Sequence, residues 1–273
     1  MPELPEVEAT ARELRGWTRG RRLLRVRVTA GRQTRGMAAR TFARLLEGRA
    51  VQDVTRRGKW MLVRLSGDAG LALHLGMTGD LVRAEDGVEP PYSRASLRLD
   101  RGGTVHFVDP RRFGRLVASA CYQDLLAMPG VGGLGPDALE VTPARLREAL
   151  RTSRAIKTAL LDQGALAGLG NIYATDALFR ARLHPLTPAS LVAADAALTR
   201  RLAAAIREVL KRGMARWDRS ERPERDGEAL YPGSVYGLGG RPCPRCGGPL
   251  ESRSIGARAT VFCPRCQPPS RGR

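Results

Sequence analysis

Two closely spaced pairs of cysteines near the C-terminus constrain the fold of this chain more than any other feature. Cys243 and Cys246 form the first Cys-x-x-Cys pair and Cys263 and Cys266 the second, with 16 residues between the pairs. Such pairs are typical of a ribbon closed around one tetrahedral Zn²⁺, which leaves no open position for catalysis. Two disulfides are the alternative, but they are rare in cytosolic proteins. We therefore expect one structural zinc ion that folds residues 235–268, with a tail over 269–273.

The net charge points to a polyanionic partner. The 273-residue chain carries a formal net charge of +19, whereas a magnitude of about 2–8 is enough for solubility. Residues 12–40 contain ten Arg against one acid, and residues 235–273 contain seven Arg against one acid. Neutralising phosphates releases counterions and drives association, so nucleic acid is the favoured partner. A charged, solvated surface without a partner is the alternative.

The sequence argues against a membrane or secreted protein. No stretch approaches the ~20 apolar residues of a membrane-spanning helix. The acidic, proline-punctuated start, from Met1 to Glu6, is unlike a secretion signal. We expect a cytoplasmic, nucleoid-associated protein, and in that compartment we interpret the fifth cysteine, Cys121, as a buried structural thiol.

Lysine is rare among the basic residues. Of 46 basic residues only Lys59, Lys157 and Lys211 are lysines. Unlike arginine, lysine can give up a proton. Lys211 ends an amphipathic helical segment and is interpreted as a surface charge, whereas Lys59 and Lys157 are candidate functional residues.

Hydrophobic periodicity predicts an α+β fold with two domains. Residues 3–16 have helical spacing and end at Gly16, and short strands are expected at 23–29, 60–65, 71–75, 97–99, 104–108 and 116–118. We expect an N-terminal helix plus an antiparallel β-sandwich over residues 1–120. Chain breakers predict a linker over 121–141. A helical domain over 142–234 follows, with helices near 143–151, 155–163, 171–182 and 195–212 and an irregular loop over 218–234.

A glycine-rich turn in the helical domain is a candidate phosphate site. Gly168-Leu-Gly-Asn171 lies between two of the expected helices. The free amides at the start of the second helix can bind phosphate.

The N-terminus offers a candidate nucleophile. Removal of Met1 would leave Pro2 as a free secondary amine. An α-amino group titrates near pH ~8, so about a tenth of it is neutral at pH 7, against less than about a thousandth of lysine. A neutral amine can attack a sugar carbon and form an iminium, or Schiff base. Taken locally, however, these residues favour an ordinary helix N-terminus, with Pro in the first turn and acids that suit the helix dipole.

The order of several motifs along the chain resembles the formamidopyrimidine-DNA glycosylase family. The resemblance extends from residue 2 to residue 267 and rests on these segments: Met1-Pro-Glu-Leu-Pro-Glu-Val-Glu8, Arg57-Gly-Lys59, His74-Leu-Gly-Met77, Asp109-Pro-Arg-Arg-Phe-Gly114, Gly168-Leu-Gly-Asn-Ile-Tyr-Ala174 and the four-cysteine unit ending Cys266-Gln267. It implies that the helical domain is a helix-two-turn-helix domain and that the four-cysteine unit is a hairpin finger.

The resemblance also implies a role for particular residues. Pro2 would attack C1′ of the damaged nucleotide, with Glu3 as the acid/base that helps to open the sugar. Lys59 would contact phosphate and assist proton transfer, and Arg258 on the finger would hold the phosphates flanking the lesion. Lys157 and Asn171 would clamp backbone phosphates, and Tyr92 and Arg154 are further candidate DNA-binding residues.

Met77, Arg112 and Phe113 resemble the family's void-filling residues. A base must leave the stack before an enzyme reaches its sugar, and an apolar wedge with an Arg can fill the hole. Core packing is the alternative for Met77 and Phe113, but flanking glycines favour exposed loop tips.

The sequence departs from the family pattern at three places. Tyr92 stands where the family usually has histidine, and Asp176 where it tends to have glutamate. After Lys211 the chain reads Gly213-Met-Ala-Arg-Trp-Asp218 in place of a Gly-Gly-Thr-Thr-like segment that begins the loop over the flipped base. The last departure leaves the preferred lesion open.

The favoured function is therefore a bifunctional DNA glycosylase and AP lyase, acting as a monomer on double-stranded DNA with oxidised purines or abasic sites. One alternative is an endonuclease VIII-like enzyme for oxidised pyrimidines. Another is a non-catalytic DNA-damage-binding protein, against which the presence of Pro2, Glu3 and Lys59 argues.

Overall fold

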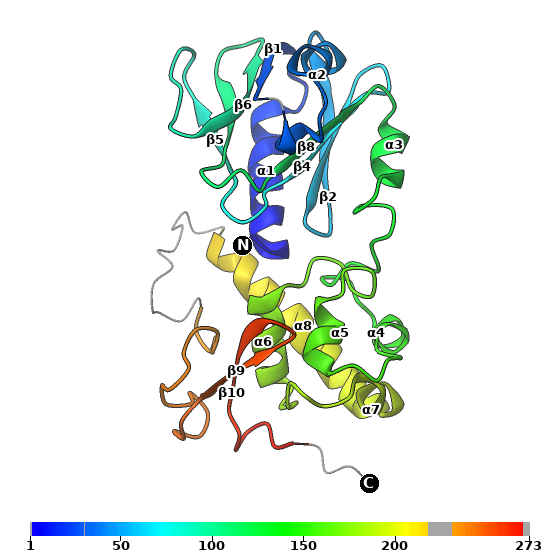
Figure 1. Cartoon of the computed structure of the whole chain (residues 1–273), viewed down its shortest axis with the longest axis vertical. Coiled ribbons are helices and arrows are strands. Elements are labelled where there is room, and N and C mark those ends of the chain that lie inside the picture. The colour runs from blue at the N-terminus through cyan, green and yellow to red at the C-terminus, as the bar shows by residue number, and fades with distance from the viewer. Residues whose placement is uncertain (1, 30, 218–230, 270–273) are drawn as a thin grey trace. The chain divides into compact units, whose positions relative to one another are not determined.

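The computed structural model describes residues 2–29, 31–217 and 231–269 (Figure 1). The chain forms two compact units. The N-terminal unit comprises Met1–Pro2 and Glu6–Gly133, and the C-terminal unit comprises Glu3–Pro5 and Leu134–Arg273. The segment expected as a linker, 121–141, thus contains the passage between the units, and it also includes the short helix α3 (Tyr122–Ala127).

Helix α1 (Leu4–Thr18) begins in the C-terminal unit and continues through the N-terminal unit. Its buried residues Val7, Ala11 and Leu14 have the expected helical spacing. The expected end at Gly16 is wrong, because the helix runs on to Thr18, whose hydroxyl donates to the Leu14 carbonyl (2.6 Å). The left-handed glycine that follows the helix is Gly20, with φ of 74°.

Two antiparallel four-stranded sheets make up most of the N-terminal unit. The strands of the first sheet lie in the order β1 (Leu23–Val28), β6 (Ser93–Leu99), β7 (Thr104–Val108) and β5 (Asp80–Ala84). The strands of the second sheet lie in the order β2 (Val51–Arg57), β3 (Trp60–Leu65), β4 (Gly70–His74) and β8 (Arg115–Ser119). The expected antiparallel sandwich is confirmed. Apolar side chains of both sheets, of α1 and of α2 (Ala39–Leu46) form one core.

The sequence did not predict every element of this unit. The strands β2 and β5, the helices α2 and α3 and the 3₁₀ turn Arg32–Thr34 were all missed. Cys121, expected to be buried, is half-buried at the start of α3 and forms no disulfide.

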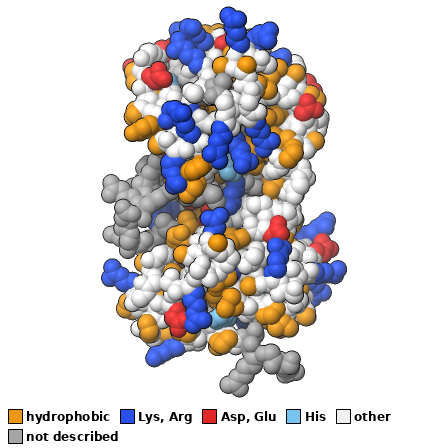
Figure 2. All heavy atoms as spheres, viewed as in Figure 1, with side chains coloured by type: hydrophobic (Ala, Val, Ile, Leu, Met, Phe, Trp, Pro, Cys, Tyr) orange, Lys and Arg blue, Asp and Glu red, His pale blue; other side chains and the backbone are white. Residues whose placement is uncertain are grey.

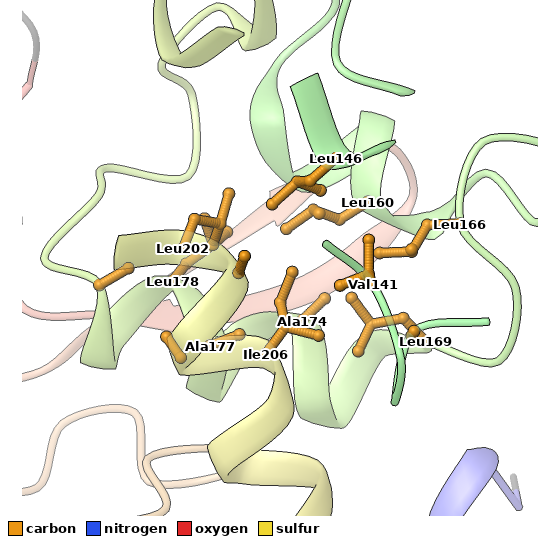
Figure 3. Packing of buried hydrophobic residues seen from close by; sticks show 14 of the residues in the cluster. Val141, Leu146, Leu160, Leu166, Leu169, Ala174, Ala177, Leu178, Leu202 and Ile206 are labelled. Carbon is orange, nitrogen blue, oxygen red and sulfur yellow. The ribbon is translucent and has the colours of Figure 1, made fainter. Parts of the chain in front are cut away.

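The C-terminal unit is helical. It contains α4 (Pro143–Ala149), α5 (Ile156–Leu161), α6 (Asn171–Arg180), α7 (Ala189–Ala194) and α8 (Ala196–Trp217), of which α7 was not expected. Leucine, isoleucine and alanine side chains from these helices form its core, as Figure 3 shows around Leu160, Ile206 and Leu178. Residues 218–230, most of the expected loop, lie outside the described residues.

The finger is a hairpin of β9 (Glu251–Ile255) and β10 (Arg258–Phe262). Gly256 and Ala257 connect the strands, each with φ of 57°, which is the backbone of a two-residue type I′ turn. A small core beneath the hairpin includes Phe179, Val235, Leu250 and Val261. Within the described ranges, no helix is both long and apolar enough to cross a membrane.

Candidate functional site

Two loops of the N-terminal unit lie in backbone contact and expose the residues expected to fill a gap in DNA. The first follows β4 and carries Met77; the second follows β7 and carries Arg112 and Phe113. A Cβ at Gly76 would lie 2.5 Å from the Phe113 carbonyl carbon, so only glycine fits at this contact. Met77 and Phe113 are 37% and 36% exposed, which fits loop tips rather than core packing.

The carboxylate of Asp109 fastens these two loops together. Asp109 is fully buried and accepts hydrogen bonds from the Thr78 hydroxyl (2.8 Å) and the Gly114 amide (2.7 Å). Gln33 Nε2 donates to the same carboxylate at 3.4 Å. Asp109 therefore links the loop after β4 to the loop after β7.

The second loop holds its exposed residues in a strained conformation. Arg112 has a left-handed backbone, with φ of 58°, which is unfavourable for a side chain of this size. The guanidinium groups of Arg32 and Arg111 lie 5.5 and 5.0 Å from the centre of the Phe113 ring. These cation–π contacts orient the ring without covering it.

Tyr92 joins the same region through its backbone. Its carbonyl accepts a hydrogen bond from the Asp109 amide (3.0 Å), and its side chain is 58% exposed. The Arg94 guanidinium lies 5.9 Å from its ring centre. The structure thus places Tyr92, Met77, Arg112 and Phe113 in one part of the N-terminal unit.

His74 supports the loop that carries Met77. Its Nδ1 accepts a hydrogen bond from the Gly76 amide (3.0 Å), and its ring packs against Trp60. Burial, together with the charges of Arg115 and Lys59, lowers the pKa of His74 to about 4. Neutral His74 therefore has a structural role in this loop.

This pKa predicts an acid-dependent loss of stability. Because the folded-state pKa lies below the unfolded value of about 6.5, the unfolded state binds the proton more tightly, and stability falls as the pH drops from 6.5 towards 4. The loss attributable to His74 is about 3 kcal/mol. Urea unfolding of the wild type and His74→Asn between pH 4 and 8 measures it. The variant keeps an acceptor but cannot titrate there, so parallel pH profiles would contradict the assignment.

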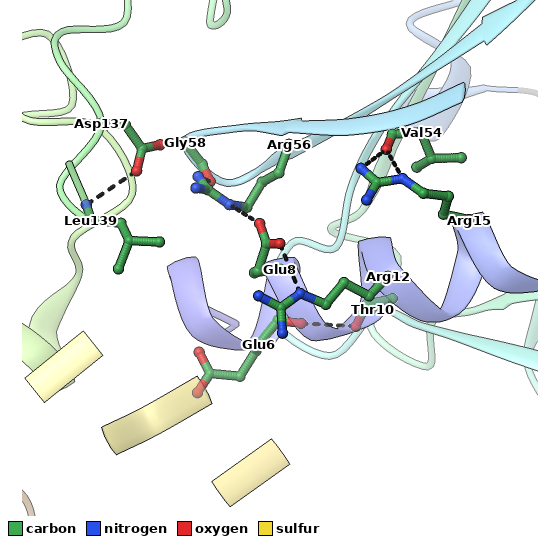
Figure 4. A network of polar contacts seen from close by, with 10 residues as sticks. All are labelled: Glu6, Glu8, Thr10, Arg12, Arg15, Val54, Arg56, Gly58, Asp137 and Leu139. Atoms are coloured by element: carbon green, nitrogen blue, oxygen red, sulfur yellow. Dashed lines mark hydrogen bonds and ion pairs between the residues drawn. The ribbon is translucent and has the colours of Figure 1, made fainter. Parts of the chain in front are cut away.

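Lys59 follows a tight turn between β2 and β3. Gly58 has φ of 57°, and its carbonyl accepts from Arg56 Nη1 (2.9 Å). Glu8 on α1 accepts from both Arg56 (2.8 Å) and Arg12 (3.0 Å), as Figure 4 shows. The turn is thus anchored to α1 through a buried arginine, and Lys59 itself is 8% exposed. Pro2 is also buried and lies two residues before the first residue of α1.

Glu3 caps the N-terminus of α6 within the C-terminal unit. Its Oε1 accepts from the Ile172 amide (2.9 Å) and its Oε2 from the Tyr173 amide (3.3 Å). A Cβ on Gly170 would lie 2.3 Å from the Glu3 carboxyl carbon. The glycine-rich turn that was expected to bind phosphate therefore holds a carboxylate from the chain itself, and the positive end of the helix dipole stabilises its charge.

The expectation that Lys157 contacts DNA phosphate is not met in this structure. Lys157 is fully buried, and its Nζ donates to the Asn171 carbonyl (2.9 Å) and to the Thr175 hydroxyl. Burial lowers the pKa of Lys157 to about 7, against the attraction of Glu3 and Asp176. Its hydrogen bonds show what it does instead: it holds the first turns of α6.

Asn171 and Arg258 are linked through the finger strand β10. Asn171 Nδ2 donates to the carbonyl of Ala259 (2.9 Å), the residue after Arg258, while the Asn171 Oδ1 is buried without a partner among the described residues. Arg258 is exposed. Arg154 is also exposed and is paired with Asp162 at 2.8 Å.

Asp176 has a structural role that the sequence did not reveal. It is almost fully buried and accepts from Tyr231 Oη (2.6 Å), Ser234 Oγ (2.7 Å) and the amides of Val235 (2.9 Å) and Tyr236 (3.2 Å). Burial raises the pKa of the Asp176 carboxyl, and the four donors oppose that shift. This carboxylate ties α6 to residues 231–236, just before the finger.

The four cysteines of the finger have the geometry of a zinc site. Their Sγ atoms all lie within 4.8 Å of one another. The Sγ atoms of Cys246 and Cys263 are 3.5 Å apart, and those of Cys243 and Cys266 are 3.9 Å apart. Zn–S bonds of about 2.3 Å at tetrahedral angles separate the sulfur atoms by about 3.8 Å. The arrangement fits one structural zinc ion, and none of the four forms a disulfide.

Basic side chains dominate the surface charge. Figure 2 shows Lys and Arg gathered on the face in view, with few Asp and Glu among them. This distribution accords with the net charge of +19 and with a polyanionic ligand.

Known proteins resemble the chain along almost its whole length. Three family models match in succession: the formamidopyrimidine-DNA glycosylase N-terminal domain over residues 1–116, the formamidopyrimidine-DNA glycosylase H2TH domain over 133–222, and a zinc finger found in FPG and IleRS over 240–269. A formamidopyrimidine-DNA glycosylase of Chloroflexus aurantiacus is 40% identical over 274 residues, which cover 98% of each chain.

Solved structures show the same likeness. The crystal structure of the MutM (Fpg) protein from Thermus thermophilus is 39% identical with a TM-score of 0.81, covering 99% of this chain and 100% of that one. The Lactococcus lactis formamidopyrimidine-DNA glycosylase, bound non-covalently to DNA that contains an AP site, is 26% identical with a TM-score of 0.83, covering 97% of this chain and 99% of that one.

Proposed function

The chain belongs to the formamidopyrimidine-DNA glycosylase family, and on this premise we propose that it excises oxidised purines from duplex DNA by covalent catalysis at Pro2. The enzyme is a DNA glycosylase with the family's AP lyase activity. Its proposed substrates are 8-oxoguanine and formamidopyrimidines, and its proposed location is the cytoplasm, associated with the nucleoid, as a monomer.

The observation that carries this proposal is the position of Glu3. Glu3, the residue after Pro2, is held by two amides at the start of α6, and the absence of a Cβ on Gly170 leaves room for its carboxylate. A carboxylate held in this way has a fixed position and can exchange a proton with a bound sugar.

The proposed reaction begins at the neutral Pro2 nitrogen. Its lone pair attacks C1′, the electrons of the glycosidic bond leave with the base, and the base takes up a proton. The Glu3 carboxylate takes the proton from the resulting Pro2 ammonium and passes it to O4′ as the C1′–O4′ bond breaks, which leaves a cationic iminium between Pro2 and C1′. Loss of a C2′ proton drives β-elimination of the 3′ phosphate, and δ-elimination of the 5′ phosphate follows. Water finally hydrolyses the Schiff base and restores the amine.

Other residues are assigned to DNA binding and positioning. We assign Lys59 to phosphate contact and proton transfer, and Arg258 to the phosphates beside the lesion. Met77 and Phe113 are proposed to enter the gap left by the flipped base, with Arg112 facing the opposite base. Tyr92, Arg154 and Asn171 supply further phosphate contacts. Zinc would supply folding energy to the finger and no chemistry.

Borohydride trapping tests the proposal. The protein is incubated with duplexes that contain 8-oxoguanine, thymine glycol or an abasic site, and mass spectrometry maps the reduced crosslink. We expect a crosslink at Pro2 with the abasic and 8-oxoguanine duplexes. A preference for thymine glycol would indicate the oxidised-pyrimidine specificity of endonuclease VIII. Binding without a crosslink on any duplex would show a non-catalytic damage binder.

Gly170→Ala is expected to slow base excision by displacing Glu3. The added Cβ would lie 2.3 Å from the Glu3 carboxyl carbon, so the carboxylate must move, whereas the extended backbone of Gly170 suits alanine. A shift of about 1 Å in a catalytic group costs on the order of 100-fold in rate. Single-turnover excision measures the change, with Gly133→Ala as the control because nothing lies within 4 Å of its Cβ. Equal rates for the two variants would exclude a positioned Glu3.

A further inference from the structure

A groove on the N-terminal unit lies outside all the residues assigned above. It has a volume of about 370 Å³ and is lined by Arg25 and Arg27 on β1, Ser96 and Arg98 on β6, His106 on β7 and the loop 86–89. None of these residues belongs to the motifs that carry the family resemblance. The groove therefore needs its own explanation.

Strand register places these side chains on one face of the sheet. Arg25 pairs with Arg98, Arg27 with Ser96, and Ser96 with His106. Cross-strand partners share a face, and successive residues alternate between faces. Because Leu97 and Val105 lie in the core, this row of polar side chains faces away from it.

Two guanidinium groups in the groove have no partner among the described residues. Arg25 and Arg27 are exposed and stand two positions apart on β1. Arg98, in contrast, lies 3.6 Å from Asp86, which also accepts from the Thr104 hydroxyl (2.9 Å). Asp86 is thus already paired with Arg98 and Thr104. Glu89 is the one other carboxylate among the lining residues. The groove retains positive charge available to a ligand.

His106 supplies a buried group that lacks a partner. It is 4% exposed, its Nδ1 lies 3.0 Å from the Ser93 hydroxyl, and its Nε2 is buried without a hydrogen bond among the described residues. Burial lowers the pKa of His106, although Glu89 and the backbone of Val88 favour the charged form. A buried polar atom without a hydrogen bond is destabilising, and a hydrogen bond to a ligand would recover that loss.

We propose that this groove binds a phosphate group, held by Arg25 and Arg27 and hydrogen-bonded by His106. Guanidinium groups match the geometry and charge of phosphate oxygens. The phosphate can come from a free phosphate compound or from the backbone of a DNA segment, and the chemistry of recognition is the same in both cases.

Nitrogen NMR of the histidine rings tests the proposal, because the chain has three histidines and each can be assigned by substitution. One arm adds inorganic pyrophosphate to the full-length protein, and the other adds an undamaged 14-base-pair duplex. We expect the His106 ring signals to shift, and with pyrophosphate those of His74 and His184 should stay in place. A shift with pyrophosphate indicates a free phosphate ligand; one with the duplex alone indicates the DNA backbone.

In the Arg25→Gln/Arg27→Gln variant, the ligand concentration that gives half of the maximal His106 shift is expected to rise at least tenfold. Arg40→Gln/Arg44→Gln on α2 is the matched control, because it removes the same charge from two exposed arginines outside the groove. Absence of any His106 shift at millimolar pyrophosphate and with saturating duplex would overturn the proposal, as would an equal response in both double variants. Base excision by the groove variant should stay within twofold of wild type, so this test is independent of the catalytic proposal.

Discussion

Replacement of Pro2 by glycine is expected to abolish the borohydride-trapped adduct while DNA binding persists. The glycine variant still has an α-amino group with a similar pKa. Loss of the adduct would therefore show that the basicity of the amine alone is not sufficient for the reaction. The pyrrolidine ring fixes the direction of the nitrogen lone pair. A secondary amine also yields an iminium that cannot lose its charge by N-deprotonation, and that charge draws electrons during β-elimination. Removing a catalytic nucleophile typically costs on the order of 1,000-fold or more.

Two measurements define this prediction. Single-turnover trapping on an abasic duplex reports the chemistry, and fluorescence anisotropy on the same duplex reports binding. Pro129→Gly is the control, because Pro129 is an exposed proline of the same unit. If Pro2→Gly were trapped at the wild-type rate, another amine would be the nucleophile and the proposed mechanism would be wrong.

Strand prediction from this sequence depended on how many residues of each strand are buried. Trp60–Leu65 and Thr104–Val108 have the bounds expected from their continuous apolar runs. In Val51–Arg57 only Val51 and Val54 are buried, and in Asp80–Ala84 only Leu81. These two strands were missed because pairing with β3 and β7, rather than their own pattern, decides their conformation.

Residue type did not predict the contacts of the charged residues in the candidate site. Lys157 and Asp176 have the charge of surface residues, but α5 and α6 pack inside the C-terminal unit and carry both side chains inward. Glu3 was identified from its place beside Pro2. Its hydrogen bonds to Ile172 and Tyr173 join residues about 170 positions apart in sequence, which no local pattern encodes.

The spacing of chemically distinctive residues was the most reliable signal. The two cysteine pairs predicted the zinc site because the ligand geometry of Zn²⁺ demands that spacing. The glycines beside Met77 and Phe113 likewise predicted exposed tips, since close backbone contact excludes side chains there. These constraints act over short segments and can therefore be recognised in the sequence without knowledge of the fold.

Removal of zinc is expected to unfold the finger and to reduce DNA affinity sharply, while the rest of the chain stays folded. The apolar core under β9 and β10 is small, and metal binding contributes about 10–16 kcal/mol to the folding of comparable fingers. Without the ion, Arg258 loses the strand that presents it and Asn171 loses its acceptor at Ala259. Three measurements before and after chelation test this prediction. Metal content reports the loss of zinc, circular dichroism reports the folded state of the chain, and anisotropy with an abasic duplex reports DNA affinity.

Cysteine variants separate this effect from general thiol chemistry. Cys246→Ser removes a ligand that is exposed and so disturbs little packing, whereas Cys121→Ser changes a thiol outside the cluster. We expect the first variant to lose its zinc and its tight DNA binding and the second to keep both. Because the helical core of the C-terminal unit does not depend on the metal, both variants should retain the main thermal transition. A zinc-free Cys246→Ser protein with wild-type DNA affinity would show that the finger does not position Arg258 for binding.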